Sequence, residues 1–300
     1  MGPAGRLARR VRCACIDIGS NTTRLLVADR TERGLAEVLQ RRAFTRLGRG
    51  LDATGCIERQ KIAEVAREVA AQVAVAQEHG AEWIRVVATA AVRRAGNRAE
   101  LCEAVRAAAG LPVEILTGEQ EARLAFEGAT RTLEHAPLGE IGVVDVGGGS
   151  TELVVGTLEH GVSWCASVSV GSGDLAESYL RSDPPTHEEL HALRAHVTGA
   201  LGSLDVPHPL HALAVGGSAT SLRLLVGAEL DPASLEGGLR VLAAHPVDEV
   251  ARRWEIDPQR VRLLPAGILL LEAASGAFGR TLRVSRGGLR EGVLLAGDTS

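Results

Sequence analysis

The chain has 300 residues, of which 45% are hydrophobic and 23% charged, so it can bury the cores of two ordinary domains and is not disordered. Its formal net charge of −4 excludes a general attraction to nucleic acid or to an anionic membrane, and an anionic ligand therefore needs a local site. No apolar run approaches the roughly 18 residues of a membrane span.

Residues 1–10 are basic and lead into no signal-peptide core. We therefore expect a flexible basic tail and a cytoplasmic protein. The five cysteines form no C-x-x-C pair, and Cys13 and Cys15 alternate onto one face of an expected strand, which indicates reduced thiols rather than a metal site. Because only three Trp, one Tyr and three Phe are present, the cores must consist of Val, Leu, Ile and Ala.

The first half of the chain predicts the element order βββαβαβα. Apolar and β-branched runs between turn residues predict the strands, and apolar residues spaced by three or four predict the helices. Strands are expected over 11–18, 23–29, 36–46, 83–89 and 113–116, and helices over 57–79, 98–109 and 119–134.

The second half repeats this order. Strands are expected over 141–146, 151–157, 162–170, 211–215 and 281–285, helices over 186–204, 217–227 and 260–275, and additional material over 230–258. The stretch "IDIGSNTTRLLV" at 16–27 returns as "VDVGGGSTELVV" at 144–155. The repeat predicts two similar domains, 11–130 and 131–300, that face each other across a cleft with both turns at its floor, where ligand sites are common.

Each copy of the repeat reads as a β-hairpin. In the second copy, Gly147, Gly148, Gly149 and Ser150 form the turn, so the backbone can take positive φ and expose its N–H groups to a ligand. The serine adds a hydroxyl donor. This combination predicts a phosphate-binding turn.

One charge changes between the two hairpins. Asp17 is expected opposite Arg24 in the first copy, whereas Asp145 is expected opposite Glu152 in the second. Two opposed carboxylates at about 5 Å repel by roughly 3 kcal/mol at an effective dielectric near 20. A divalent cation would reverse that repulsion, and Mg²⁺ is usually held by one or two carboxylates plus substrate phosphates. The alternative is a glycine hairpin with two solvated acids.

Three further stretches contribute candidate residues. In "LTGEQEARLAF", Thr117 and Gln120 predict a capping box that places Glu121 in the first turn of a helix, close to the junction of the two domains. Acids at such a position commonly serve only the helix dipole. Arg93 follows a strand end, where ligands bind in open α/β sheets, although it could be a surface charge.

The stretch "AVGGSATSLRLL" leaves a strand through two glycines and opens a helix. Gly217 and Ser218 at this helix start form a possible anion or nucleotide site. As a lone motif this signal is weak.

Together these residues resemble the exopolyphosphatase/guanosine pentaphosphate phosphohydrolase (Ppx/GppA) family of the actin-like ATPase superfamily. The matching stretches run in order along nearly the whole chain: "IDIGSNTTRLLV", "ATAAVRRA", "TGEQEARLAF", "VVDVGGGSTELVVG", "AVGGSATSLR" and "RGGLREGVLLAG". The resemblance implies an α/β fold of two ribonuclease-H-like (actin-like) βββαβαβα domains around a central cleft.

The resemblance also implies roles for single residues. The catalytic base falls on Glu121, and the Mg²⁺-associated acids fall on Asp145 and Glu152. The implied phosphate contacts are Ser20, Asn21, Arg93, Gly147, Gly148 and Ser150. The sequence departs from the family motif G-x-E-E-A-R, because it reads "GEQEAR" and carries Glu119 one place earlier.

These expectations point to a Mg²⁺-dependent exopolyphosphatase that removes the terminal phosphate of inorganic polyphosphate, with short or medium chains favoured because the C-terminal helical domain of longer relatives is missing. Guanosine pentaphosphate is expected as a secondary substrate. The alternatives are guanosine pentaphosphate hydrolysis as the main activity, a non-catalytic actin-like nucleotide-binding module, or a sugar or acetate kinase. The resemblance further suggests a homodimer, and no nucleic-acid or membrane partner is expected.

Overall fold

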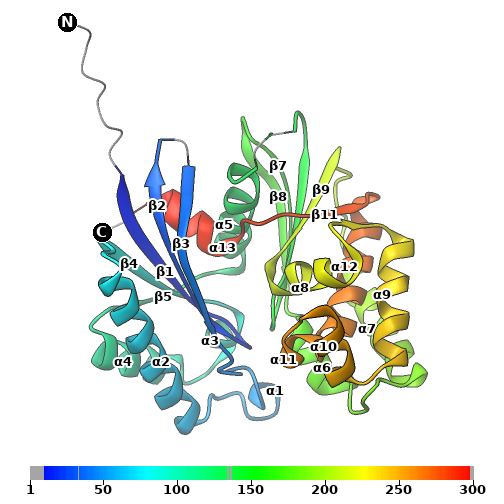
Figure 1. Cartoon of the computed structure of the whole chain (residues 1–300), viewed down its shortest axis with the longest axis horizontal. Coiled ribbons are helices and arrows are strands. Elements are labelled where there is room, and N and C mark those ends of the chain that lie inside the picture. Colours follow the sequence, from blue (N-terminus) through cyan, green and yellow to red (C-terminus); the bar gives the residue numbers. More distant parts are fainter. Residues whose placement is uncertain (1–9, 33, 134, 136, 298–300) are drawn as a thin grey trace, which may run out of the picture.

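The computed structural model describes residues 10–32, 34–133, 135 and 137–297, which form two α/β lobes side by side (Figure 1). The N-terminal lobe is built on a sheet of strand order β3-β2-β1-β4-β5, and the C-terminal lobe on a sheet of order β10-β11-β9-β6-β7-β8. Apart from the extra strand β10, the two orders are equivalent. The predicted α/β fold of two repeated domains is therefore confirmed.

The elements of the first half follow the predicted order. They are β1 Val11–Ile18, β2 Thr23–Thr31, β3 Gly34–Ala43, α1 Leu51–Thr54, α2 Arg59–Glu78, β4 Trp83–Ala88, α3 Ala90–Arg94, α4 Arg98–Ala109, β5 Val113–Ile115 and α5 Gly118–Arg131. Only the short helices α1 and α3 lack a sequence prediction.

The second half repeats the order with an insertion. Its elements are β6 Ile141–Val146, β7 Thr151–Thr157, β8 Gly161–Val168, α6 Ser172–Tyr179, α7 His187–Leu201, β9 His211–Val215, α8 Gly216–Val226, β10 Glu229–Leu230, α9 Pro232–Ala244, α10 Val247–Trp254, α11 Pro258–Val261, α12 Leu264–Phe278, β11 Leu282–Val284 and α13 Leu289–Ala296. The expected helix 260–275 instead begins at Leu264, with Pro265 in its first turn, where a missing N–H costs nothing.

Both hairpins pair as the sequence predicts. Asp17 lies opposite Arg24 on β1 and β2. Asp145 lies opposite Glu152 on β6 and β7. Arg24 and Glu152 therefore occupy equivalent positions in the two lobes but carry opposite charges.

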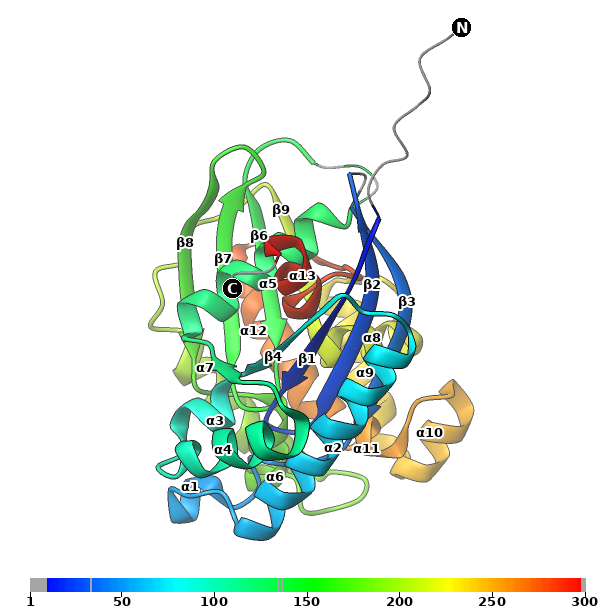
Figure 2. The same ribbon diagram turned by 90° about the vertical axis from the view of Figure 1, so that its left-hand side faces the viewer.

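Two helices are exchanged between the lobes. Helix α5 belongs to the first half of the chain but packs on β6, β7 and β8, whereas α13 ends the second half and packs on β1, β2 and β3 (Figure 2). Phe126 of α5 is buried in the C-terminal lobe. Val293 and Leu294 of α13 are buried against Cys13 and Cys15 of β1. The spatial lobes are therefore not identical with the sequence segments 11–130 and 131–300.

The exchanged helices cross at glycines. A Cβ on Gly128 of α5 would overlap the backbone carbonyl of Gly288, and one on Gly292 of α13 would overlap the carbonyl of Leu124. Without these side chains the two helix backbones approach each other closely. The sequence motif "RGGLREG" thus includes three contact glycines, Gly287, Gly288 and Gly292.

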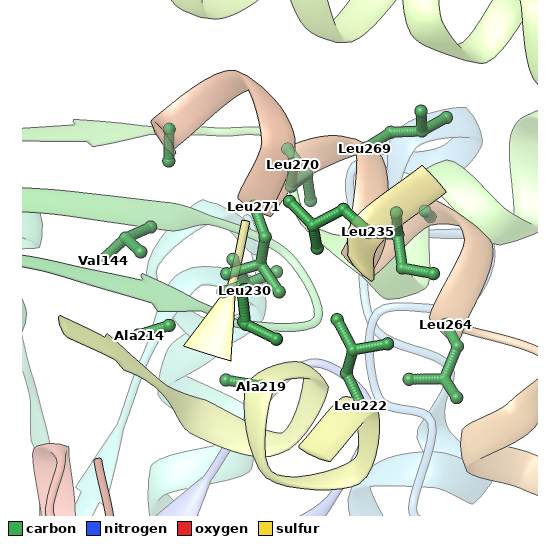
Figure 3. Close-up of a cluster of buried hydrophobic side chains, with 14 of the residues drawn as sticks. Val144, Ala214, Ala219, Leu222, Leu230, Leu235, Leu264, Leu269, Leu270 and Leu271 are labelled. Carbon is green, nitrogen blue, oxygen red and sulfur yellow. The ribbon is translucent and has the colours of Figure 1, made fainter. Parts of the chain in front are cut away.

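The core of the C-terminal lobe consists mainly of aliphatic side chains, as the composition predicts. Leu264, Leu269, Leu270 and Leu271 of α12 belong to one buried cluster with Leu222 of α8 (Figure 3). Val144 and Ala214 extend this cluster onto the sheet (Figure 3).

The expected tail 1–10 lies outside the described residues except for Arg10, whose guanidinium pairs with Asp29. All five cysteines are free thiols, and Cys13 and Cys15 are buried. Across the described ranges, no helix is both long enough and apolar enough to cross a membrane.

The helix crossing makes a prediction about stability. Gly128→Ala should lower the free energy of unfolding by about 1–3 kcal/mol, because the new methyl group overlaps a backbone carbonyl that cannot move aside. Gly199→Ala is the matched control, since nothing lies within 4 Å of its Cβ position on α7, and it should stabilise by up to about 1 kcal/mol. Denaturant unfolding measures both values, and equal stabilities would contradict the packing at the crossing.

Candidate active site

The two hairpin turns and the two exchanged helices enclose one cavity of about 100 Å³ between the lobes. We call it the inner cavity. Its wall contains Asp17, Gly19, Ser20, Asn21, Thr22, Arg24, Glu121, Asp145, Val146, Gly147, Gly148, Glu152, Ser172, Gly216, Gly217, Thr220, Arg260, Leu263, Arg286, Gly287, Gly288, Leu289, Arg290 and Glu291. The structure thus brings together the predicted acids and most of the predicted phosphate-binding residues.

The tips of the two turns touch each other. A Cβ on Gly148 would lie 3.1 Å from Cβ of Asn21, and one on Gly149 would overlap Oγ of Ser20. Gly171 and Gly173 pack in turn against the backbone of Gly148 from the other side. Glycine is therefore required in the second turn for close packing as well as for its exposed amides.

Glu121 lies at the wall of the inner cavity because of how α5 begins. Thr117 caps the helix, with its hydroxyl accepting from the Gln120 amide and the Gln120 side chain accepting from the Thr117 amide, so the predicted capping box is confirmed. The Glu121 side chain is buried, and Nη1 of Arg93 donates to its Oε2 at 2.9 Å. Burial raises the pKa of Glu121 to about 7, against the opposing effect of Arg93. A carboxylate with this pKa suits general base catalysis at neutral pH.

The neighbouring Glu119 has a different environment. Its side chain is exposed and forms an ion pair with Arg123 along the outer surface of α5. It is not part of the cavity wall. Although it is only two residues from Glu121, it faces solvent.

Asp145 and Glu152 form an acidic pair in the cavity wall. Burial raises the pKa of Asp145 to about 6 and that of Glu152 well above its usual range, and Glu121 and Asp145 raise the pKa of Glu152 further. Oγ of Ser167 donates to Oε1 of Glu152 at 2.8 Å, while Oε2 of Glu152 is buried without a hydrogen-bond partner. The expected repulsion between the two acids is therefore relieved by proton uptake at neutral pH.

Asp145 and Glu152 could hold a Mg²⁺ ion if other groups supplied the rest of its coordination. The cavity offers the opposed carboxylates of Asp145 and Glu152, the latter with an unpartnered oxygen, and oxygen is the ligand that Mg²⁺ prefers. Within the described part of the chain, no group of three or more His, Cys, Asp and Glu is arranged to hold a metal ion. A cation here would therefore need water and substrate oxygens to fill its coordination.

Arginines form the opposite wall of the inner cavity. Repulsion from Arg290 and burial lower the pKa of Arg24 to about 9, and Arg260 lowers it further. Burial lowers the pKa of Arg260 to about 10, and its Nε has no hydrogen-bond partner in the structure. Oδ1 of Asp17 is likewise buried without a partner. Three guanidinium groups that repel each other would be stabilised by an anion between them.

Sequence reasoning missed most of this arginine wall. Arg24 was interpreted only as the charge partner of Asp17, and Arg290 stands in "RGGLREG", a stretch that received no role of its own. For Arg260, which lies on the short helix α11, the sequence contains no local signal. The charge alternation within "RGGLREG" was the available clue for Arg286, Arg290 and Glu291.

Some predicted contact residues do not reach the cavity wall. Arg93 donates to Glu121 and to the carbonyl of Leu116 instead. Ser150 is buried, and its carbonyl accepts from the Gly147 amide and closes the turn. The hydroxyl of Ser218 donates to that of Ser172. Direct phosphate contacts from these side chains stay predictions, whereas Ser20, Asn21, Gly147, Gly148 and Gly217 line the cavity.

Ser20 is the clearest candidate donor among the lining residues. Its Oγ is buried without a hydrogen-bond partner, and its carbonyl accepts from the Gly48 amide, which holds the turn in place. A buried hydroxyl without a partner costs free energy that a bound phosphate oxygen would recover. The site therefore combines a base, an acidic pair, unpartnered donors and several guanidinium groups in one small cavity.

The raised pKa values make the stability of the metal-free protein depend on pH. Above the unfolded carboxyl pKa of about 4, the folded protein holds protons on Asp145 and Glu121 that the unfolded chain has released. This contribution is complete below the unfolded pKa and is lost as the pH rises through the folded pKa values of about 6 and about 7. We expect the melting temperature in EDTA to fall from about pH 4.5 to about pH 7.5 because of these groups.

Asp145→Asn should flatten this fall, and Asp205→Asn, at an exposed site, should leave it unchanged. Thermal unfolding of the three proteins in a buffer series measures the effect. Identical pH profiles for the wild type and Asp145→Asn would contradict the raised pKa of Asp145.

Comparison with known proteins agrees with this geometry. The sequence profile of the Ppx/GppA phosphatase family matches residues 26–297. Exopolyphosphatase 2 of Mycobacterium tuberculosis is 40% identical over 193 residues, which are 61% of this chain and 59% of that relative. Exopolyphosphatase 1 of Mycobacterium leprae is 29% identical over 303 residues, which are 95% of this chain and 89% of the relative.

A solved structure has the same architecture. The Ppx/GppA family member of Aquifex aeolicus superposes with a TM-score of 0.80 at 32% identity, and the superposition covers 96% of this chain and 97% of that one. With a family profile that spans nearly all of its length and this shared two-domain actin-like fold, the chain belongs to the Ppx/GppA phosphatase family.

Proposed function

We propose that the protein is a Mg²⁺-dependent exopolyphosphatase that hydrolyses the terminal phosphoanhydride bond of inorganic polyphosphate. The observation that carries the proposal is the position of Glu121, buried in the inner cavity with a pKa of about 7 and facing an acidic pair and two glycine turns. The relatives named exopolyphosphatase support the same activity.

In this mechanism Glu121 accepts a proton from a water molecule as the water oxygen attacks the terminal phosphorus. The anhydride P–O bond on the far side of that phosphorus breaks, and the shortened polyphosphate leaves with the electron pair. Arg93 holds the Glu121 carboxylate in position through its 2.9 Å hydrogen bond. The backbone amide of Gly148 and the hydroxyl of Ser20 stabilise the charge on the phosphoryl oxygens.

Asp145 and Glu152 would hold the Mg²⁺ ion. When bound, this ion supplies Lewis acidity to the phosphate oxygens. Glu152, whose pKa lies well above its usual range in the metal-free protein, would release its proton to serve as a charged ligand.

Polyphosphate is a better match for the site than a nucleotide. The inner cavity presents arginines, backbone amides and hydroxyls, and none of its described lining residues is an aromatic side chain that could stack on guanine. We therefore rank guanosine pentaphosphate as a secondary substrate and simple monoesters as poor ones.

Substitution of the base tests the mechanism. Glu121→Gln should keep the fold and substrate binding but reduce kcat by about 10²- to 10⁴-fold, because the amide cannot accept the proton. Glu119→Gln is the matched control two residues away on the same helix, and it should retain nearly full activity because its side chain is exposed. Steady-state phosphate release measures both, and equal losses would assign the base to another residue.

Substitution of the acidic pair tests the metal. Glu152→Gln should raise the Mg²⁺ concentration required for half-maximal activity, since it removes a charged oxygen ligand. The melting temperature of the metal-free protein should stay level or rise, because the buried Glu152 already favours its neutral form. A clear loss of metal-free stability would instead indicate a structural role for Glu152.

A substrate panel decides the activity itself. At fixed Mg²⁺, kcat/KM should be higher for short inorganic polyphosphate than for guanosine pentaphosphate, and low for p-nitrophenyl phosphate. The opposite order would make guanosine pentaphosphate the main substrate. Phosphate transfer to ADP in place of release would indicate a kinase, and binding without turnover would indicate a nucleotide-binding module.

A further inference from the structure

A second, larger cavity opens next to the inner cavity. It has a volume of about 500 Å³ and is bordered by α6, α11 and the loop after β3. We call it the outer groove. Ser20, Asn21, Gly148 and Leu263 line both cavities, so the touching turn tips form the neck between them. A linear ligand that extends past this neck would have one end in each cavity.

The acids of the outer groove are mostly neutralised from the opposite lobe. Asp174 of α6 pairs with Arg94 of α3 at 2.7 Å. Glu177, also on α6, lies 3.7 Å from Arg49. Since each of these two acids faces an arginine across the cleft, neither cancels the remaining positive charge of the groove.

Two arginines of the groove carry that remaining charge. Arg181 follows α6 and Arg262 follows α11, and neither guanidinium forms an ion pair among the described residues. The third acid of the groove, Asp183, accepts a hydrogen bond from the Val247 amide at 2.8 Å and keeps its negative charge, which offsets one of the positive charges of the groove. Apolar side chains around Leu242 line the wall between these groups and strengthen the field of the free guanidinium groups there.

Arg46 adds a third positive charge beside the neck. Its φ of 48° is in the left-handed region that side chains other than Gly, Asn and Asp rarely adopt. Its amide donates to the carbonyl of Asn21 at 3.0 Å, and its guanidinium donates to the neutral Oε1 of Gln259 at 2.8 Å. The hydrogen bond to Asn21 fixes this conformation and holds the Arg46 side chain beside the neck.

We propose that the outer groove binds the remainder of the polyphosphate chain while the terminal phosphoryl group reacts in the inner cavity. This inference rests on the proposed function. Arg46, next to the neck, binds the first phosphoryl units outside it, and Arg181 and Arg262 bind the following ones. The groove thereby selects substrates that are long enough to reach these two arginines.

The double variant Arg181→Gln/Arg262→Gln tests the proposal. Its kcat/KM should fall about ten-fold on chains of several tens of phosphates, because two charge-assisted contacts are lost. On tripolyphosphate kcat/KM should stay at the wild-type value, since that substrate ends before the arginines. The dependence of KM on salt concentration should also become weaker for the long chain, as fewer cations contact the polyanion.

Arg59→Gln/Arg67→Gln is the charge-matched control, because both arginines are exposed on α2, away from the groove, and it should behave as the wild type with both substrates. Equal losses on the short and the long substrate would overturn the groove assignment and leave the proposed function intact. If the wild type released no phosphate from either substrate, the proposed function would fail instead. In that event binding of long-chain polyphosphate, followed by calorimetry, still tests the groove: equal affinities of wild type and double variant would exclude it.

Discussion

The contact between the two hairpin turns determines where every other part of the site lies. Gly148 and Gly149 have no side chains, so the second turn can lie against Ser20 and Asn21 of the first. This contact borders the inner cavity on one side and forms the neck to the outer groove. A Cβ at Gly149 would overlap Oγ of Ser20, so the two turn tips would have to move apart.

Exclusion of water then sets the chemistry of the acids. Burial is the first cause of the raised pKa at Asp145, Glu152 and Glu121, and their mutual repulsion adds to it. The pKa values of Arg24 and Arg260 are lowered by burial and by repulsion from neighbouring arginines. Buried charges of both signs therefore line one small cavity. A bound Mg²⁺ ion would be attracted by the acids and a bound phosphate by the arginines, so the two together would balance the charges of the cavity.

Much of this arrangement could be predicted from the sequence because it depends on local patterns. The repeat predicted the two sheets, and the four-residue turns within its two copies predicted the pairing of β1 with β2 and of β6 with β7. The capping box predicted the start of α5 and thus the position of Glu121. The path of α5 onto the other lobe depends on long-range packing, which no local pattern encodes. For the same reason the sequence could not predict that Arg93 stays behind Glu121, outside the cavity wall. Nor could it predict that Arg260 of α11 lines the cavity.

The exchange of helices also couples the folding of the two lobes. Domains generally fold as units, in the order in which they leave the ribosome. Here the face of β1 that carries Cys13 and Cys15 is covered by Leu289, Val293 and Leu294 of α13, which follow every strand of the second sheet in the sequence. The first sheet therefore cannot bury this apolar face and its two thiols until the second half of the chain has been made, so the two lobes reach their native packing together.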